Sequence, residues 1–222
     1  MIKIDSYDKK NQKLTIITDM RTSLANAIRR SVLEIPVMAI DEVEIIKNDS
    51  ALYDEILAHR LGSIPIKTEK GNKEVKFRLK EIGPKMIYST DIKPSIGSSF
   101  KIPIVLLDKD QNIEVICDAL MGKGIEHVKF SPGLAYFKHD VDDKILDYIT
   151  INNEGKVSYD EEELINSKDL SQDLINEIKA LKGIEDLRFI IESWGQFDVK
   201  EIFIKAIDTL EENLEELEKA VK

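Results

Sequence analysis

The sequence Ser23-Leu-Ala-Asn-Ala-Ile-Arg-Arg-Ser-Val-Leu-Glu-Ile-Pro36 predicts a short helix with two clear ends. Ser23 can accept hydrogen bonds from the first free amides of a helix, and Pro36 cannot continue the hydrogen-bond ladder. One face is apolar at helical spacing, with Leu24, Ala27, Ile28, Ser31, Val32 and Ile35. The opposite face carries Asn26, Arg29, Arg30 and Leu33. Because a solvated face rarely has a leucine at its centre, we expect a second surface to cover this helix in addition to its own domain.

The composition is typical of a globular protein that does not grip nucleic acid. The 222 residues are 42% hydrophobic and 33% charged, with a net charge of −10, whereas binding a nucleic-acid backbone needs clustered positive charge. The single cysteine, Cys117, excludes an internal disulfide and an all-cysteine metal site within this chain. The first residues lack the apolar core of a signal peptide, and no apolar run is long enough to span a bilayer. We therefore expect a cytoplasmic protein without specific DNA binding or membrane insertion.

Hydrophobic periodicity predicts regions of different kinds along the chain. We expect strands at 2–4 and 13–18, the helix described above, a strand at 37–47 and a second helix at 51–61. From 67 to about 153 the period changes to two. Short strands are expected there at 75–79, 86–88, 102–107, 113–117, 127–130, 135–137 and 148–151. Residues 152–183 are acidic with helical patterning over 164–181, which favours a solvated helical insertion, and a strand at 188–193 follows.

The last predicted helix has a narrow apolar seam. Asp198 is a good helix cap, Glu201 could complete a capping box, and Phe197 could pack against Ile202. Apolar residues then recur with the 3.5-residue period of a coiled coil, at Phe203, Ile207, Leu210, Leu214, Leu217 and Val221. Such a seam is typical of a helix that meets a helix of another chain. Packing on the sheet of its own domain remains the alternative.

No group of residues indicates an intrinsic active site. Glu55 and His59 lie four residues apart on the second predicted helix, but a second histidine and a third ligand are missing. Gly122-Lys-Gly124 resembles a phosphate loop only loosely, and the usual nucleotide-binding and hydrolase motifs are absent. His59, His127 and His139 are too scattered for a nucleophile with its base and orienting group. We expect no catalytic residue, no metal and no cofactor.

An ordered set of motifs resembles one RNA polymerase family. The first half of the chain contains Ala25-Asn-Ala-Ile-Arg-Arg30, Ile35-Pro36, Glu42-Val-Glu-Ile45, Asn48-Asp-Ser50, Asp54-Glu55 and Ala58-His-Arg-Leu-Gly-Ser-Ile-Pro65. The second half adds Tyr88-Ser-Thr-Asp91, Ile102-Pro-Ile104, Gly122-Lys-Gly-Ile-Glu-His-Val-Lys-Phe-Ser-Pro132 and Ile191-Glu-Ser-Trp-Gly195. This set is similar to the D subunit of archaeal RNA polymerases, to the third-largest subunit of eukaryotic nuclear polymerases and, more remotely, to bacterial alpha. The length, and the absence of a bacterial-type carboxy-terminal DNA-binding domain, favour the archaeal branch.

The resemblance implies an α+β fold with a discontinuous dimerisation domain. Residues 1–47 and 186–222 would form this domain from a sheet and the first and last helices, and 48–185 would form an inserted strand-rich domain. Many archaeal relatives carry a ferredoxin-like domain with iron–sulfur clusters in the region that corresponds to 152–183. That stretch contains no cysteine here, so we expect a remnant without a cluster.

The resemblance also implies a role in assembling DNA-directed RNA polymerase, a nucleotidyltransferase, and not in its chemistry. In this family the dimerisation domain pairs with a smaller homologous protein, the L subunit. That heterodimer, joined by the small zinc-binding N and P subunits, is the platform for the large catalytic subunits. By position, the contact with L would include Leu24, Ile28, Val32, Phe203, Ile207, Leu210, Leu214 and Leu217.

The polar face of the first helix has a separate implied role. By position in the family, Asn26, Arg29 and Arg30 would face the second-largest subunit or hold the assembly surface. The planar fork of arginine suits such buried polar contacts better than lysine does. His59, Arg60 and residues 122–132 are secondary candidates for subunit contacts, with a structural role as the alternative. Two other classes of function stay open, a stand-alone enzyme and a helix-mediated dimerisation module that is not involved in transcription. Co-purification with polymerase subunits separates these possibilities.

Overall fold

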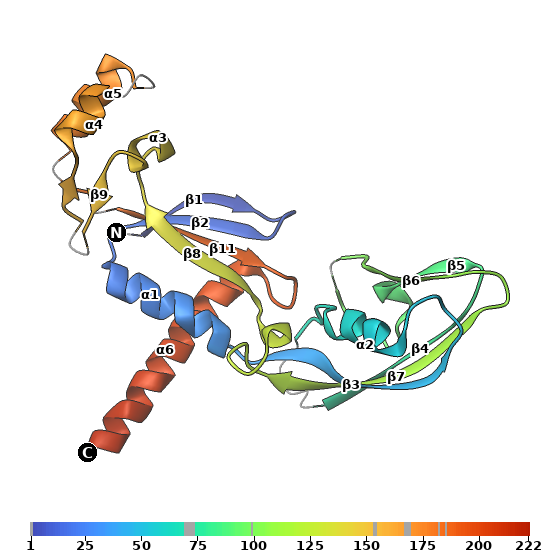
Figure 1. The fold of residues 1–222 in the computed structure, drawn as a ribbon. Coiled ribbons are helices and arrows are strands. Elements are labelled where there is room, and N and C mark those ends of the chain that lie inside the picture. Colours follow the sequence, from blue (N-terminus) through green and yellow to red (C-terminus); the bar gives the residue numbers. More distant parts are fainter. Residues whose placement is uncertain are drawn as a thin grey trace.

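The first sheet has four antiparallel strands in the order β1-β2-β11-β8 (Figure 1). The computed structural model of the protein describes residues 2–68, 74–98, 100–152, 155–166, 170–181, 183–184 and 186–222. The strands are β1 Ile2–Asp8, β2 Lys13–Thr18, β8 Gly133–His139 and β11 Leu187–Ser193. Leu14 lies opposite Ile191 and Ile16 opposite Phe189, so these four apolar side chains share one face of the sheet.

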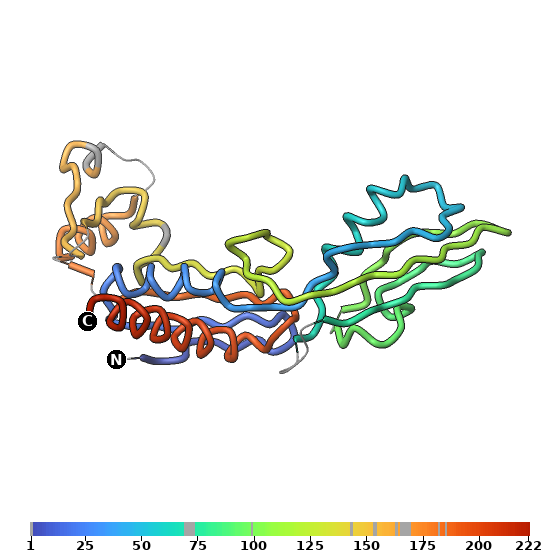
Figure 2. Tube along the Cα trace, turned by 90° about the horizontal axis from the view of Figure 1, so that it is seen from below, coloured from blue at the N-terminus to red at the C-terminus, as the bar shows by residue number. Residues whose placement is uncertain are grey.

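Two helices cover that face and pack against each other (Figure 2). They are α1 Thr22–Ser31, which continues into the 3₁₀ helix η1 Val32–Glu34, and α6 Val199–Val221. The core between helices and sheet includes Ala25, Ile28, Val32, Phe189, Ile202 and Ala206. The terminal parts of the chain therefore fold together around one core, and the predicted discontinuous α+β unit is confirmed.

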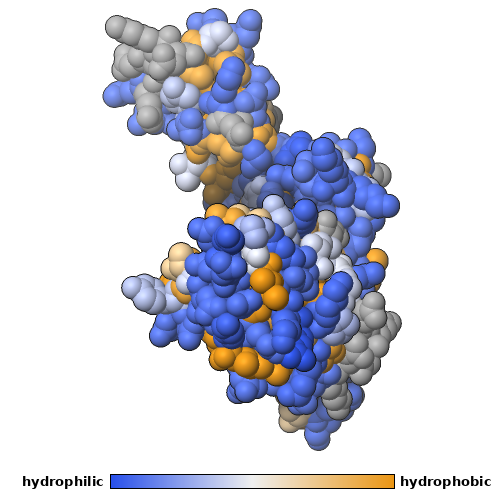
Figure 3. Space-filling model, turned by 90° about the vertical axis from the view of Figure 1, so that its right-hand side faces the viewer, coloured by the Kyte–Doolittle hydropathy of each residue, from blue (hydrophilic) through white to orange (hydrophobic). Residues whose placement is uncertain are grey.

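A second unit, which we call the insertion, is joined to the first by two long strands, β3 leading into it and β7 leading back (Figure 1). Its main sheet has the order β3-β7-β4, with β3 Val37–Asn48, β7 Asn112–Gly122 and β4 Glu74–Ile82. The remaining elements are α2 Asp54–Gly62, β5 Lys85–Tyr88, η2 Ser89–Asp91, β6 Pro103–Leu107 and, at the junction with the first sheet, η3 Val128–Phe130. Alternate residues of β7 are buried in a second core, which α2 joins through Leu57 and Leu61. Seen end-on, the insertion has apolar patches set in a largely hydrophilic surface (Figure 3).

Between β8 and β11 the chain forms a small lobe with a third core. Its elements are α3 Asp143–Leu146, β9 Thr150–Ile151, β10 Val157–Ser158, α4 Glu161–Asn166 and α5 Gln172–Ala180. The core consists of Ile145, Leu164 and Ile178 with a ring of partly buried apolar residues. Residues of this lobe that we predicted to be a solvated helical insertion thus enclose apolar side chains of their own.

The structure changes the predicted limits of the domains. β8 pairs with β11 along its whole length, so residues 133–139 lie in the first sheet and not in the region 48–185 to which we assigned them. The chain therefore leaves this sheet twice, once for the insertion and once for the lobe. Alternation of apolar residues shows that a segment is a strand, but the partner of that strand is distant in sequence and invisible to the pattern.

Several local predictions are also wrong. Residues 128–130 form η3 and not a strand, and 164–181 contains parts of two helices and not one. The predicted cap at Ser23 is absent, because α1 begins at Thr22 with Arg21 before it and no side-chain bond there. The cap at Asp198 is confirmed, since its carboxylate accepts a hydrogen bond from the Lys200 amide at 2.9 Å.

The second helix also begins later than predicted, at Asp54 and not at residue 51. The side chain of Asn48 organises a turn before it, accepting from the Ser50 amide at 3.1 Å and donating to the Leu52 carbonyl at 2.9 Å. Asparagine and serine side chains of this kind compete with the helix for backbone groups. The turn therefore delays the start of α2.

Candidate subunit interface

The apolar residues of α6 are buried in the core of the first unit near the start of the helix and exposed to solvent near its end. Val199, Ile202 and Ala206 are fully buried against the sheet and α1. Phe203, Ile207 and Leu210 are half-buried at the margin of that core. Farther along the same seam, Leu214 is 56% exposed and Leu217 is 61% exposed, and Val221 is exposed as well. We call the half-buried and exposed residues, Phe203, Ile207, Leu210, Leu214, Leu217 and Val221, the α6 seam.

The geometry of the helix explains this change in burial. At about 100° per residue, the centre of the α6 seam lies roughly 70° from the centre of the face that the sheet and α1 cover. Asn213 still contacts the first unit, because its side chain donates to Glu34 Oε2 at 2.8 Å. Beyond it, α6 continues past α1 (Figure 1), and its acidic residues pair with Lys219 and Lys222. The end of α6 is therefore a helix with one free apolar edge.

α1 contributes less apolar surface than the sequence predicted. Ile28 and Val32 are buried in the core of their own domain, so they lie beneath the surface and are not exposed to a partner. Leu24 is 48% exposed, and Leu33 is exposed on the other side of the helix. Ile204 on α6 is also exposed, although the 3.5-residue pattern left it out. Its position three residues before Ile207 was the signal that could have included it.

The polar face of α1 is partly preorganised. The Arg29 guanidinium donates two hydrogen bonds to Asn26 Oδ1, from Nη2 at 2.9 Å and from Nε at 3.2 Å. Arg30 is exposed, and its guanidinium has no hydrogen bond or ion pair within the part of the chain that the structure describes. Asn26 and Arg29 thus present a fixed polar pair beside a free guanidinium.

The secondary candidates fall into two groups. The Arg60 guanidinium donates to the Ile104 carbonyl, a contact that ties α2 to β6 and gives Arg60 a structural role. His59 and His127 line one groove, between α2 and the loop around η3, whereas His139 lines a different one beside the start of α1. Burial lowers the pKa of His139. Residues 122–132 form the loop that packs against η1, where the Ile125 amide donates to the Leu33 carbonyl at 3.2 Å.

The described ranges contain neither a metal site nor a helix suited to a bilayer. No group of three histidine, cysteine, aspartate or glutamate side chains in those ranges could hold a metal ion. Cys117 is fully buried on β7, and burial raises the pKa of its thiol to about 11. None of the described helices has the length and hydropathy needed to cross a bilayer.

A sequence model described as the RNA polymerase Rpb3/Rpb11 dimerisation domain matches residues 15–214. The chain belongs to this family. The match begins in β2 and ends within α6, so it includes both separated parts of the first unit and everything inserted between them. The resemblance drawn from the ordered motifs is confirmed. The matched residues include the first part of α6, the helix whose apolar seam predicts a contact with another chain.

Several relatives are named DNA-directed RNA polymerase subunit Rpo3. The protein from Halobacterium salinarum is 31% identical over 235 residues, which cover 93% of this chain and 92% of the relative. The protein from Pyrococcus horikoshii is 39% identical over 155 residues, 63% of this chain and 60% of the relative. The protein from Methanocaldococcus jannaschii is 45% identical over 128 residues, 55% of this chain and 67% of the relative. The chain therefore spans about 60% of the Pyrococcus relative and nearly all of the Halobacterium one.

Proposed function

We propose that this chain is a non-catalytic assembly subunit of DNA-directed RNA polymerase that pairs with the smaller homologous L subunit. The observation that carries the proposal is the free apolar edge of α6, at Leu214, Leu217 and Val221, in a chain of the dimerisation-domain family. Fully burying each such side chain stabilises a complex by roughly 1.5–3 kcal/mol. A partner helix laid along α6 and across α1 would cover this edge together with Leu24.

The pair would act as a platform in the cytoplasm. The N and P subunits would join it, and the large subunits that make RNA from the four ribonucleoside triphosphates would assemble on it. We propose that Asn26, Arg29 and Arg30 face the second-largest subunit. The fixed Asn26–Arg29 pair supports this, because an arginine that is already oriented loses less conformational entropy when it binds. We also propose that the chain binds no cofactor, since its one cysteine cannot hold an iron–sulfur cluster.

The pairing with L is tested by replacing exposed residues of the α6 seam. In the double variant Leu214→Asp, Leu217→Asp, two charges would lie in the contact, where an unpaired buried charge is strongly destabilising. Co-expressed with L, this variant should elute as a monomer in size-exclusion chromatography, whereas the native chain elutes as a heterodimer. Glu216→Gln on the wet face of α6 is the matched control and should leave the heterodimer intact. A heterodimer that survives the double variant would refute the assignment.

The polar face of α1 is tested separately. Arg30→Ala should leave the heterodimer with L intact and reduce co-purification of the second-largest subunit by about tenfold or more, because interface arginines often dominate binding. Arg21→Ala, at the other end of α1, is the matched control for loss of a positive charge. Equal recovery of the second-largest subunit with both variants would show that this face lies outside the contact.

A further inference from the structure

One flank of the α6 seam carries acidic side chains. When the seam is written as a coiled-coil heptad, Ile204, Glu211 and Glu218 each follow a seam residue directly, at intervals of seven. All three side chains are exposed. In a coiled coil, residues at this position lie at the margin of the apolar contact and meet the flank of the partner helix. Their charge therefore affects which partner the seam can bind.

The other flank of the seam faces the first unit of the chain itself. Its row of residues, again at intervals of seven, begins with Ala206, which is buried. It continues with Asn213, whose side chain donates to Glu34 Oε2 at 2.8 Å. Because this flank is occupied over most of its length, a partner helix reaches the seam from the side of Glu211 and Glu218.

The same side of α6 faces the free edge of the first sheet, at β1. Lys200 lies four residues before Ile204, hence on the same side of the helix, and its Nζ is 4.2 Å from the centre of the Tyr7 ring on β1. Farther along β1, Ile4 pairs with Ile16 and so lies on the sheet face that carries the core. Ile4 is nevertheless exposed, as is Ile204. On this side, exposed isoleucines accompany the start of α6, whereas carboxylates line its end.

The second half of α6 has a strong excess of negative charge. The side chains of residues 208–222 comprise six carboxylates and two ammonium groups, which leaves a net charge of −4. Glu215 pairs with Lys219 and Glu218 with Lys222, whereas Glu211 has no ion pair among the residues that the structure describes. Exposed pairs of this kind contribute little to stability. The acidic flank can therefore pair with charges that a partner brings.

A second copy of this chain is a poor partner for such a surface. Two identical subunits related by a twofold axis pair through the same surface on each, so each acidic flank would meet a surface of the same charge. Like charges at the flanks of a coiled coil disfavour pairing, whereas lysine or arginine at the facing positions favours it. The charges of α6 therefore favour a different chain with a basic flank.

We propose that the α6 seam selects its partner by charge. The seam binds an amphipathic helix of a different chain, which carries lysine or arginine beside its apolar residues, and Glu211 and Glu218 prevent two copies of this chain from pairing through α6. The proposal rests on the proposed function, in which the partner is the L subunit. It adds the charge that this partner must carry and a physical reason for pairing with a different chain.

The first test measures binding of the purified L subunit to the full chain by isothermal titration calorimetry. The double variant Glu211→Lys, Glu218→Lys should weaken binding by about tenfold or more at low salt. The loss should be much smaller at about 1 M salt, where charges are screened beyond roughly 3 Å. Glu212→Lys, Glu216→Lys makes the same change in net charge on the far side of α6 and should bind like the native chain. Equal affinities of the two double variants would overturn the proposal.

The second test measures self-association by analytical ultracentrifugation. The native chain and Glu212→Leu, Glu216→Leu should be monomers, whereas Glu211→Leu, Glu218→Leu should form a homodimer, because the seam is then wider and free of repulsion. A native homodimer, or a Glu211→Leu, Glu218→Leu variant that stays monomeric, would also overturn the proposal. Failure of the native chain to bind L at all is a separate result, because it would refute the proposed function itself.

Discussion

At the scale of single residues, burial separates side chains that the sequence pattern treats alike. Ile28 and Leu24 both belong to the predicted apolar face of α1, yet only Leu24 retains a large exposed surface. Likewise, Arg29 and Arg30 are neighbours, but Asn26 fixes the orientation of Arg29 alone. Residue type and spacing could identify these candidates. Their division into supporting and contacting residues depends on how much of each the domain itself covers.

Cys117 gives a chemical test of the insertion core. Because burial raises the pKa of its thiol to about 11, reactive thiolate is scarce in the native protein at mildly alkaline pH. We expect iodoacetamide to label the native chain very slowly and the denatured chain completely, as measured by mass spectrometry after timed quenching. Ile82→Cys, which places a thiol at an exposed position of the same unit, should be labelled at once. Equal rates for native and denatured chains would contradict the burial of Cys117.

At the scale of elements, the two halves of the single helix α6 lie in different environments. Its first half is part of a core, and its second half has a solvated acidic face and an uncovered apolar edge. The 3.5-residue period predicts that a seam exists, and it is right. The 3.5-residue period does not predict at which residue of α6 the first unit ceases to cover the helix. That residue depends on how far α1 and η1 extend beside α6.

This division predicts different effects for two similar substitutions. Leu210→Asp should destabilise the isolated chain by about 2 kcal/mol, because Leu210 packs against the core of the first unit. Leu214→Asp should change the stability of the isolated chain by no more than about 0.5 kcal/mol, because Leu214 is exposed. Chemical denaturation followed by circular dichroism measures both. Equal losses of stability would mean that the boundary between the two halves of α6 is misplaced.

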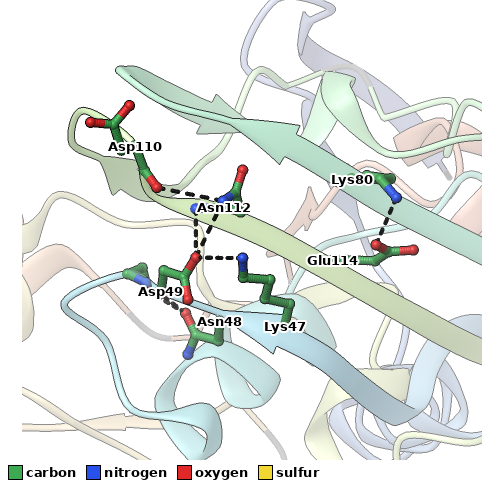
Figure 4. Close-up of polar contacts among 8 residues, drawn as sticks. Lys47, Asn48, Asp49, Lys80, Asp110, Asn112 and Glu114 are labelled. Carbon is green, nitrogen blue, oxygen red and sulfur yellow. Dashed lines mark hydrogen bonds and ion pairs between the residues drawn. The ribbon is translucent and has the colours of Figure 1, made fainter.

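The strands of the insertion carry carboxylates whose ion pairs respond to acid. Lys80 and Arg78 lower the pKa of Glu114, and Lys47 lowers that of Asp49. Figure 4 shows the Lys80–Glu114 and Lys47–Asp49 pairs. A carboxyl with a lowered pKa in the folded state stabilises the fold above its ordinary pKa, near 4, and that contribution disappears as the pH falls through the lower folded value. Stability of the insertion should therefore decline on acidification below about pH 4.

The variant Glu114→Gln isolates this contribution. Its melting temperature should be lower than that of the native chain near neutral pH, and the difference should shrink as the pH falls below about 4. Added salt should also reduce the difference, since these pairs are near the surface and salt screens them. A difference that stays constant between neutral and acidic pH would show that the carboxylate charge is not the cause.

At the scale of the whole molecule, the described residues form three hydrophobic cores. The chain leaves the first sheet twice, once for the insertion and once for the lobe. The lobe between β8 and β11 lies where the resemblance implies a cluster-bearing domain in many relatives, and it is built around Ile145, Leu164 and Ile178. Apolar packing between these side chains holds the lobe together. The lobe is thus a structural module with a core of its own.

The absence of cysteine from the lobe leads to a direct measurement. We expect the purified chain to contain far less than one iron and one acid-labile sulfide per molecule, because a thiolate-bound cluster needs several cysteines. Iron and sulfide assays, calibrated with a ferredoxin of known content, measure both quantities. Stoichiometric iron together with sulfide would contradict a lobe without a cluster.

Local order in the chain was sufficient to predict the family, the α+β class, the helix at α1 and the seam of α6. These features depend on short-range periodicity and on motifs, which are readable within a few turns or strands. Folding alone revealed that β8 belongs to the first sheet, that Ile28 and Val32 are covered internally, and that Trp194, Gln196 and His59 meet in one groove. The reason is that pairing and burial arise from contacts between residues far apart in sequence, and no local pattern records which distant surface a side chain will meet.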